Sequence, residues 1–462
     1  MHKKFSIKLG YIPISKFVFS WEDAKKYKQL IEDKLKEWSI DYVNIDTVVK
    51  DGMIYRMEDI DTVVEYLKSK KVDAIFCPHC NFGTEEVVGL IGRKMGVPLL
   101  LWGPRDEHPN LDGTRLRDTL CGLMASSKVL GKLGVPFNYI ENCRLDDKEF
   151  REGFERFIRV ASVVKGMRNM RIGQVGSRLD FFWTTIINES QLLKKFNIQV
   201  LPIDMVDVIS AVRKRAGRNE KKYAEELKIL KKEIDLEGFE DESVLLNLLA
   251  LRDELLALAE KECLSGFAIH SLSIREGLGI YTSYADAFLT EMGIPVAMET
   301  DIHGAISSIL LQHASMNDGP TFLVDITIRH PENENGILLW HGSIPLSLRD
   351  QKVRPRLDKH WILKSPYSGM THWKLKSGDI TLMRFDEVSG KYRMGTGEAK
   401  TIPGPATLNN YVWVEVSDWK RWENKLIYGP YIHHISCAYG KYSSIFKEVI
   451  RYFPEIEFES FD

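Results

Sequence analysis

Glu299, Asp325 and His341 are three side chains that can bind a metal ion or move a proton, and each comes at the end of a short apolar run. Ligands of open α/β sheets bind outside the carboxyl ends of the strands, so this placement predicts that the three residues meet at one edge. Two carboxylates and one imidazole suit a divalent cation such as Mn²⁺, Mg²⁺ or Co²⁺. The alternative is that the carboxylates only cap the helices that follow their strands, as Asp301 is expected to do.

The pair His433 and His434 is a further candidate for a metal site. Adjacent residues of a strand point to opposite faces, so only one of the two is expected to enter a given site. The other interpretation is a partly buried histidine among the aromatic residues of this segment.

Cys77 and Cys80 form a CxxC motif after the expected strand Val72–Cys77. A redox pair needs a thiolate stabilised at the start of a helix, and a zinc site needs two more ligands. The sequence has no second CxxC, and a polar segment that could line a pocket follows, from Asn81 to Glu86. Structural or pocket use is therefore favoured, with a thiol oxidoreductase as an alternative.

Composition excludes several classes of protein. The formal net charge is −2 for 462 residues, which argues against a nucleic-acid partner and against a polybasic membrane-surface protein. No apolar run approaches the roughly 20 residues that span a bilayer, and no signal peptide is recognised. Six cysteines do not form a disulfide framework. Dinucleotide, G-x-S-x-G and H-E-x-x-H motifs are absent. We expect a cytoplasmic, thiol-reduced protein with no membrane partner.

The elements that must position these residues fall into three parts. Strands alternate with helices in residues 1–165 and again in residues 166–345, which predicts two α/β domains with parallel sheets. The second is expected to include a strand over Phe196–Pro202, a long amphipathic helical region over Val206–Glu262, and further strands of the same sheet over Thr321–Ile326 and Gly336–Trp340. Short alternating runs in residues 346–462 predict an antiparallel β domain.

The order Glu299, Asp325, His341 and a late His-His pair resembles the L-fucose isomerase / L-arabinose isomerase superfamily, and specifically its short fucose-isomerase-related members. The spacings of 26 and 16 residues between the first three are similar to those of arabinose isomerases, whereas Asp at position 325 is the choice of fucose isomerases. The matching segments are Val296–Ala305, Phe322–Asp325, Leu339–Pro345, Leu101–Arg105 and Asp118–Gly122.

This resemblance implies a cytoplasmic, Mn²⁺-dependent aldose–ketose isomerase with two Rossmann-like α/β domains and a C-terminal antiparallel β-barrel. It implies a homo-oligomer, a trimer or hexamer, with pockets between subunits. The substrate would be a pentose or 6-deoxyhexose of the L-fucose, D-arabinose or L-arabinose type. Mg²⁺ or Co²⁺ could replace Mn²⁺.

By resemblance the metal ligands are Glu299, Asp325, His341 and His434, with His433 as the alternative to His434. Glu299 and Asp325 are the catalytic candidates, which would move a proton between C2 and C1 through a metal-bound enediolate. Which of them acts first as the base stays open. Trp102 and Asn81 are candidates for the pocket of a neighbouring subunit, or for ordinary core and turn positions.

The rival hypothesis is a cytoplasmic sugar-binding or sensory protein without catalysis. Two α/β domains that face each other across a cleft also describe periplasmic-type binding proteins. The set of metal-competent residues at strand ends weighs against this interpretation.

Overall fold

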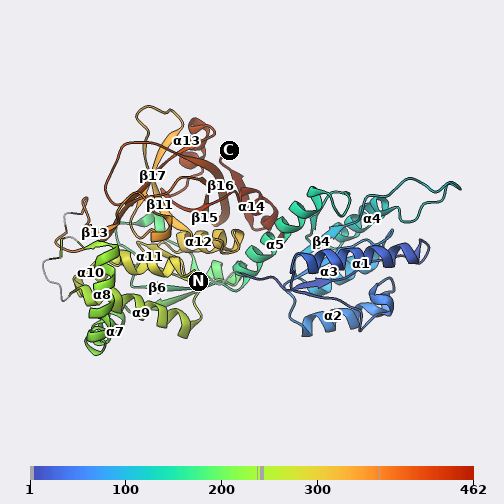
Figure 1. The fold of residues 1–462 in the computed structure, drawn as a ribbon, viewed down its shortest axis with the longest axis horizontal. Coiled ribbons are helices and arrows are strands. Elements are labelled where there is room, and N and C mark those ends of the chain that lie inside the picture. Colours follow the sequence, from blue (N-terminus) through green and yellow to red (C-terminus); the bar gives the residue numbers. More distant parts are fainter. Residues whose placement is uncertain (1–4, 237, 240–243, 364) are drawn as a thin grey trace. The chain divides into compact units, whose positions relative to one another are not determined.

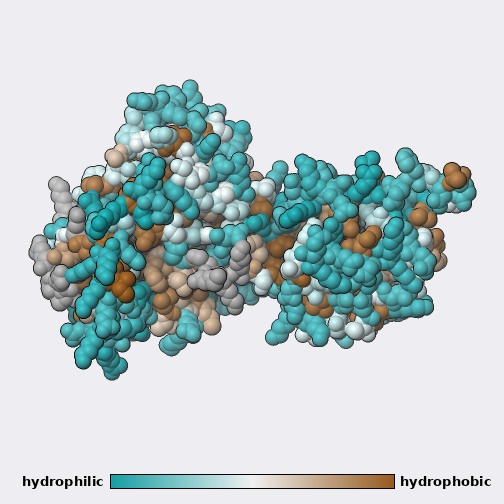
Figure 2. All heavy atoms as spheres, in the orientation of Figure 1, coloured by the Kyte–Doolittle hydropathy of each residue, from teal (hydrophilic) through white to brown (hydrophobic). Residues whose placement is uncertain are grey.

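The computed structural model describes residues 5–236, 238–239, 244–363 and 365–462. Its contacts divide the chain into two compact units (Figure 1). The N-terminal unit consists of Phe5–Lys165 with Glu448–Phe453, and the C-terminal unit consists of Gly166–Lys447 with Pro454–Asp462. None of the described helices is long and apolar enough to cross a membrane. The face in Figure 2 is mostly hydrophilic, with apolar residues in scattered patches, as expected when the large apolar side chains fill the cores.

The N-terminal unit is an α/β sandwich around a five-stranded parallel sheet in the order β2-β1-β3-β4-β5. The sequence predicts this alternation correctly, because β3 and β4 are fully buried apolar runs and helices separate them. Ser20 caps α1, with its hydroxyl accepting a hydrogen bond from the amide of Asp23. The strands are β1 (Leu9–Tyr11), β2 (Tyr42–Val43), β3 (Ala74–Pro78), β4 (Leu99–Trp102) and β5 (Asn138–Tyr139), and the helices are α1 (Trp21–Glu37), α2 (Ile60–Ser69), α3 (Glu85–Met95), α4 (Thr119–Lys132) and α5 (Lys148–Arg168).

The C-terminal unit begins with a second parallel sheet, in the order β10-β9-β6-β7. The expected long helical region is three helices, α7, α8 and α9, whose apolar faces pack into one core with β9. The expected strand over Phe196–Pro202 is displaced, since Phe196 ends α6 and β7 starts at Gln199. The strands are β6 (Arg171–Val175), β7 (Gln199–Ile203), β9 (Gly266–Ile269) and β10 (Val296–Met298), and the helices are α6 (Glu189–Phe196), α7 (Met205–Arg218), α8 (Glu220–Glu233), α9 (Leu245–Glu262), α10 (Ser271–Leu278), α11 (Ser283–Glu291) and α12 (Ile302–Ala314).

A closed six-stranded antiparallel barrel follows in the same unit. Its strands pair in the order β16-β15-β18-β11-β12-β17, and β17 pairs with β16 to close the ring. A tight turn joins β15 to β16 as a hairpin. The barrel strands are β11 (Phe322–Arg329), β12 (Gly336–His341), β15 (Asp379–Val388), β16 (Lys391–Ile402), β17 (Asn410–Val416) and β18 (His434–Tyr439).

Shorter elements extend the barrel sheet at both ends. Strand β19 runs parallel to β16, β14 pairs with β17, and β13 joins β14 to β8. The bounds are β8 (Asp235–Leu236), β13 (Arg356–Lys359), β14 (Ser368–Lys374) and β19 (Ile456–Ser460), with α13 (Trp419–Tyr428) and α14 (Ser443–Val449).

The α/β class with parallel sheets and a C-terminal antiparallel barrel is therefore confirmed. The expectation that β11 and β12 continue the second parallel sheet is wrong, because the two strands are antiparallel to each other and belong to the barrel. Only residues 330–335 join them, whereas a parallel pair needs a crossover of a dozen or more residues. The further division of the C-terminal unit near residue 345 stays a prediction.

Candidate metal centre

The four residues that the sequence singles out come together in the C-terminal unit. Glu299 follows β10, Asp325 lies within β11, His341 ends β12 and His434 begins β18. The barrel register places Asp325 directly opposite His434. The ligand-competent atoms of Glu299, His341 and His434 all lie within 4.8 Å of one another. The centre therefore forms where the edge of the parallel sheet meets the barrel.

Nε2 of His434 lies at the middle of this cluster. It is 3.1 Å from Oε2 of Glu299 and 3.5 Å from Oδ1 of Asp325. Nε2 of His341 is 3.8 Å from the same oxygen of Asp325. Two carboxylates and two imidazoles thus point at one small volume.

His433 makes a second group with Asp325 and His434, also within 4.8 Å. Its Nε2 is 4.0 Å from Oδ1 of Asp325, but its side chain is 46% exposed, whereas that of His434 is fully buried. The ring centroids of the two histidines lie 4.5 Å apart, and the Nε2 atoms of both lie within 4.0 Å of Oδ1 of Asp325. His434 belongs to both groups and is the more deeply buried of the two histidines, so the geometry favours it as the ligand. Its role as a ligand stays a prediction.

The turn that carries Glu299 has an unusual backbone. Glu299 and Thr300 have φ values of 61° and 56°, in the left-handed region that non-glycine residues seldom adopt. The amide of Thr300 donates to the carbonyl of Ile269 in β9, and its hydroxyl donates to the carbonyl of Ser177. Such conformations cluster at functional sites, where the surroundings hold them. Here they turn the Glu299 carboxylate toward His434.

The donor set fits a divalent cation. Nε2 of His434 and Oδ1 of Asp325 are buried and make no well-aligned hydrogen bond with any described residue. Buried polar atoms in proteins normally have a partner. A cation between imidazole nitrogens and carboxylate oxygens would satisfy these atoms, and this set is typical of Mn²⁺, Co²⁺ and related ions.

Asp301 and Arg384 form a buried layer beneath His434 that the sequence did not reveal. Nδ1 of His434 donates to Oδ2 of Asp301 at 3.0 Å, and Arg384 binds both oxygens of Asp301 at 2.6 and 3.0 Å. Asp301 also caps α12 as expected, accepting from the amide of Gly304. The bond at Nδ1 fixes the ring orientation and directs Nε2 to the centre.

The charges of this cluster shift the ionisation of its members. Burial opposes the charged forms of Asp301 and His434. Arg384 and His434 nevertheless hold the pKa of Asp301 well below its usual range. The hydrogen bond to Asp301 and the nearby carboxylate of Glu299 raise the pKa of His434 to about 10. Burial also raises the pKa of Glu299, but the neighbouring His434 and His341 outweigh it and lower the pKa overall. Without a cation, a proton on His434 therefore balances the carboxylates.

Aromatic side chains border the centre on two elements. The ring of Phe182 lies 6.2 Å from that of His433 and 6.1 Å from that of His434, edge to face. Trp340 lies 6.2 Å from His341. The run Phe181-Phe182-Trp183, of which Phe181 and Trp183 are largely exposed, is the sequence signal that could have indicated Phe182.

Trp102 and Asn81 lie inside the N-terminal unit. The amide oxygen of Asn81 accepts from the backbone of Lys16 and Gly83, and so ties two loops together. The ring of Trp102 packs against Phe150 at 4.4 Å. Both residues are fully buried, and these contacts give each of them a structural role within the unit. Their role in a pocket of a neighbouring subunit stays a prediction.

The CxxC motif has the features of a core segment. Cys77 and Cys80 are unbonded to each other and buried, and burial raises the pKa of both thiols above the usual range. A reactive thiolate needs the opposite shift. The thiol oxidoreductase alternative therefore has no support in this geometry.

Comparisons with known proteins extend over most of the chain. The model of the fucose/sulfoquinovose isomerase N-terminal domain matches residues 10–168. The sulfoquinovose isomerase of Priestia megaterium is 24% identical over 439 residues, which cover 93% of this chain and 94% of that protein. The sulfoquinovose isomerase of Alkalicoccus urumqiensis is 23% identical over 402 residues, covering 85% and 86%.

Among solved structures, a periplasmic solute-binding protein from Actinobacillus succinogenes with bound D-allose is 13% identical and covers 68% of this chain and 92% of its own. The TM-score of 0.18 is too low for this likeness to bear on the fold or the function.

Proposed function

Since this chain is a fucose-isomerase-related protein, we propose that it is an aldose–ketose isomerase of carbohydrate metabolism. The observation that carries this proposal is the convergence of Glu299, Asp325, His341 and His434 on one point, with unpartnered buried atoms on two of them. The similarity to sulfoquinovose isomerases along 93% of the chain supports the same reaction class.

These four residues would hold the metal ion, with Mn²⁺ as our first choice and Mg²⁺ or Co²⁺ as substitutes. When bound, such a cation supplies Lewis acidity, which stabilises negative charge on oxygens of the substrate. The chain contributes the proton transfer. Isomerisation needs a group that takes the proton from C2 and returns one to C1. Glu299 and Asp325 both lie beside Nε2 of His434, and the lowered pKa of Glu299 keeps a carboxylate ready to accept a proton at neutral pH.

Several sugars are candidates for the substrate. A pentose or 6-deoxyhexose of the L-fucose, D-arabinose or L-arabinose type follows from the sequence resemblance, and the name of the relatives adds sulfoquinovose to the candidates. We also propose a homo-oligomer, a trimer or hexamer, as the resemblance implies.

The decisive experiment follows ketose formation by NMR. The protein is stripped with EDTA and incubated with each of the four sugars, with and without Mn²⁺. We expect one sugar to be converted only when Mn²⁺ is restored. The Glu299→Gln variant should lose this conversion, and Glu332→Gln, which changes an exposed residue of the β11–β12 connection, should retain it.

The opposite result is equally clear. Sugar binding that is indifferent to EDTA, with no ketose formed from any of the sugars, would favour the sugar-binding or sensory alternative.

A further inference from the structure

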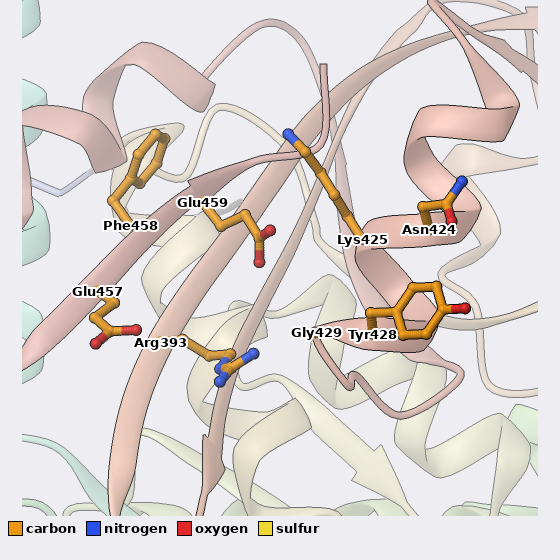
Figure 3. A pocket seen from close by; sticks show the side chains of 8 residues that line it. All are labelled: Arg393, Asn424, Lys425, Tyr428, Gly429, Glu457, Phe458 and Glu459. Carbon is orange, nitrogen blue, oxygen red and sulfur yellow. The ribbon is translucent and has the colours of Figure 1, made fainter.

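A cavity of about 610 Å³ opens on the C-terminal unit, and none of its lining residues belongs to the candidate metal centre. Its walls come from β16, from the last turn of α13 and from β19 (Figure 3). Small-molecule sites in proteins have volumes of roughly 300–1,000 Å³. The lining residues are Arg393, Asn424, Lys425, Tyr428, Gly429, Glu457, Phe458 and Glu459.

Arg393 has unused hydrogen-bonding capacity in this cavity. Its Nε is buried and has no hydrogen-bond partner in the described part of the chain. Among the described residues, its guanidinium lies over the face of the Tyr431 ring, at 5.5 Å from the centroid, as a cation–π pair. In the view of Figure 3 the guanidinium lies between the side chains of Glu457 and Tyr428. A half-buried guanidinium without a partner has donors to offer to a ligand.

The other charged groups are mostly engaged. Glu459 accepts a hydrogen bond from the hydroxyl of Tyr431 at 3.0 Å, and Lys425 donates to the carbonyl of Ser460. The amide nitrogen of Asn424 donates to the carbonyl of Lys420, which leaves its oxygen available. Glu457 is exposed and adds a second acceptor. The cavity therefore presents donors on Arg393 and acceptors on Asn424 and Glu457.

From this arrangement we infer a second, non-catalytic binding site for a neutral polyol such as a monosaccharide. Two cations and two carboxylates line the cavity, so it carries no net charge that would select an ion. The last turn of α13 presents the negative end of the helix dipole, which disfavours an anion. Adjacent hydroxyls both donate and accept, and they can satisfy Arg393 and Glu457 together.

Tyr428 completes the match to a sugar. Its side chain is 83% exposed although it lines the cavity. An aromatic ring with one polar end suits a ligand that has an apolar C–H face and a hydroxyl rim. Arg393, Tyr428 and Glu457 are thus the residues that recognise the polyol.

The test measures binding of myo-inositol and D-glucose by saturation-transfer NMR and calorimetry. The protein used is the full chain with its catalytic centre disabled by Glu299→Gln and His341→Asn, so that no sugar is converted, and the cavity variants then identify which part of the binding belongs to the second site. We expect saturable binding that Tyr428→Ala and Arg393→Gln each weaken at least fivefold. Ile427→Ala is the matched control, since it alters an exposed neighbour that does not line the cavity and should leave binding unchanged.

Three results would overturn the inference. The first is an absence of binding by either polyol to the disabled protein. The second is polyol binding that does not respond to Tyr428→Ala, a variant of an exposed side chain that should fold normally. The third is Arg393-dependent binding of inorganic phosphate or glycine in place of the polyols, which would make the cavity a site for ions. None of these results depends on whether the protein is an isomerase.

Discussion

His434 and Asp301 are joined by a buried hydrogen bond of 3.0 Å between Nδ1 and Oδ2, and Asp301 is held in turn by both terminal nitrogens of Arg384. The pair comes from positions 133 residues apart, on β18 and at the start of α12. It aligns the imidazole so that Nε2 faces Glu299 and Asp325. Residues that orient a metal-binding histidine in this way are worth about 10–100-fold in metal affinity.

Asp301→Asn should therefore lower the affinity for Mn²⁺ by about 10–100-fold. Asparagine can still cap α12, but it no longer balances the buried charge of Arg384, so we also expect a loss of about 3–5 kcal/mol in the free energy of unfolding. Calorimetric titration with Mn²⁺ and urea unfolding measure the two effects. Asp204→Asn alters an exposed cap of α7 and is the matched control. Unchanged Mn²⁺ affinity in Asp301→Asn would show that this bond does not orient a ligand.

The two histidines of the late pair should behave differently. His434 is common to both possible ligand groups, whereas His433 is 46% exposed and its Nε2 is 4.0 Å from the nearest carboxylate oxygen. We expect His434→Asn to abolish Mn²⁺ binding and His341→Asn to weaken it about tenfold or more, by analogy with the loss of one ligand interaction. His433→Asn should have an effect of less than about threefold, because it removes no contact with the central point. Electron paramagnetic resonance of free Mn²⁺ measures each affinity. A larger loss in His433→Asn than in His341→Asn would instead select the group that contains Asp325, His433 and His434.

Asp286 gives a prediction of pH dependence. It is fully buried, accepts from the hydroxyls of Thr282 and Ser343 through Oδ2, and has no partner for Oδ1 among the described residues. Burial raises the pKa of Asp286 to about 7, against about 3.9 in an unfolded chain. Between these values the folded protein holds a proton that the unfolded chain has lost. Raising the pH through this window therefore favours unfolding, by at most about 4 kcal/mol.

Asp286→Asn removes this titration while keeping the shape of the side chain. The free energy of unfolding of the variant minus that of the unaltered protein should rise by about 2–3 kcal/mol from pH 5 to pH 8. Urea unfolding at the two pH values gives this difference, in which the other titrating groups cancel. A difference that is independent of pH would mean that Asp286 ionises normally.

The sequence predicted that Glu299, Asp325, His341 and His434 lie together, as the structure has them, but not the way in which they are held; their role as metal ligands stays a prediction. Strand-end positions identified Glu299 and His341. Strand alternation predicted that only one histidine of the late pair enters a given site, whereas both His433 and His434 lie within 4.0 Å of Oδ1 of Asp325. The prediction that β11 lies in the parallel sheet was wrong because an apolar run indicates a buried strand but not the strand with which it pairs. The pairing of Asp325 with His434 spans more than 100 residues and depends on closure of the barrel.

The buried layer was missed for the same reason. Arg384 lies 83 residues from Asp301 and appears in the sequence as one cation within an alternating strand. Local patterns indicated the cap at Asp301, which the structure confirms. The contact of Asp301 with a residue far along the chain cannot be seen in any local sequence pattern. Likewise, the apolar pattern did not divide Val206–Glu262 into α7, α8 and α9, since apolar residues from all three helices enter the same core.

Phe182 provides the last prediction. Its ring meets the edges of His433 and His434 at about the same distance, and the hydrogen bond from Arg178 to its carbonyl holds the segment in place. Aromatic contacts of this kind contribute about 0.5–1.5 kcal/mol beyond the area they bury. Phe182→Ala should therefore raise KM for the converted sugar about 3–10-fold, while Mn²⁺ affinity stays within about twofold because no ligand is removed. Phe181→Ala is the matched control, since that ring is 64% exposed and contacts Phe182. Initial rates at saturating Mn²⁺ separate KM from kcat. If the two variants had the same KM, Phe182 would pack against the histidines without contacting the sugar.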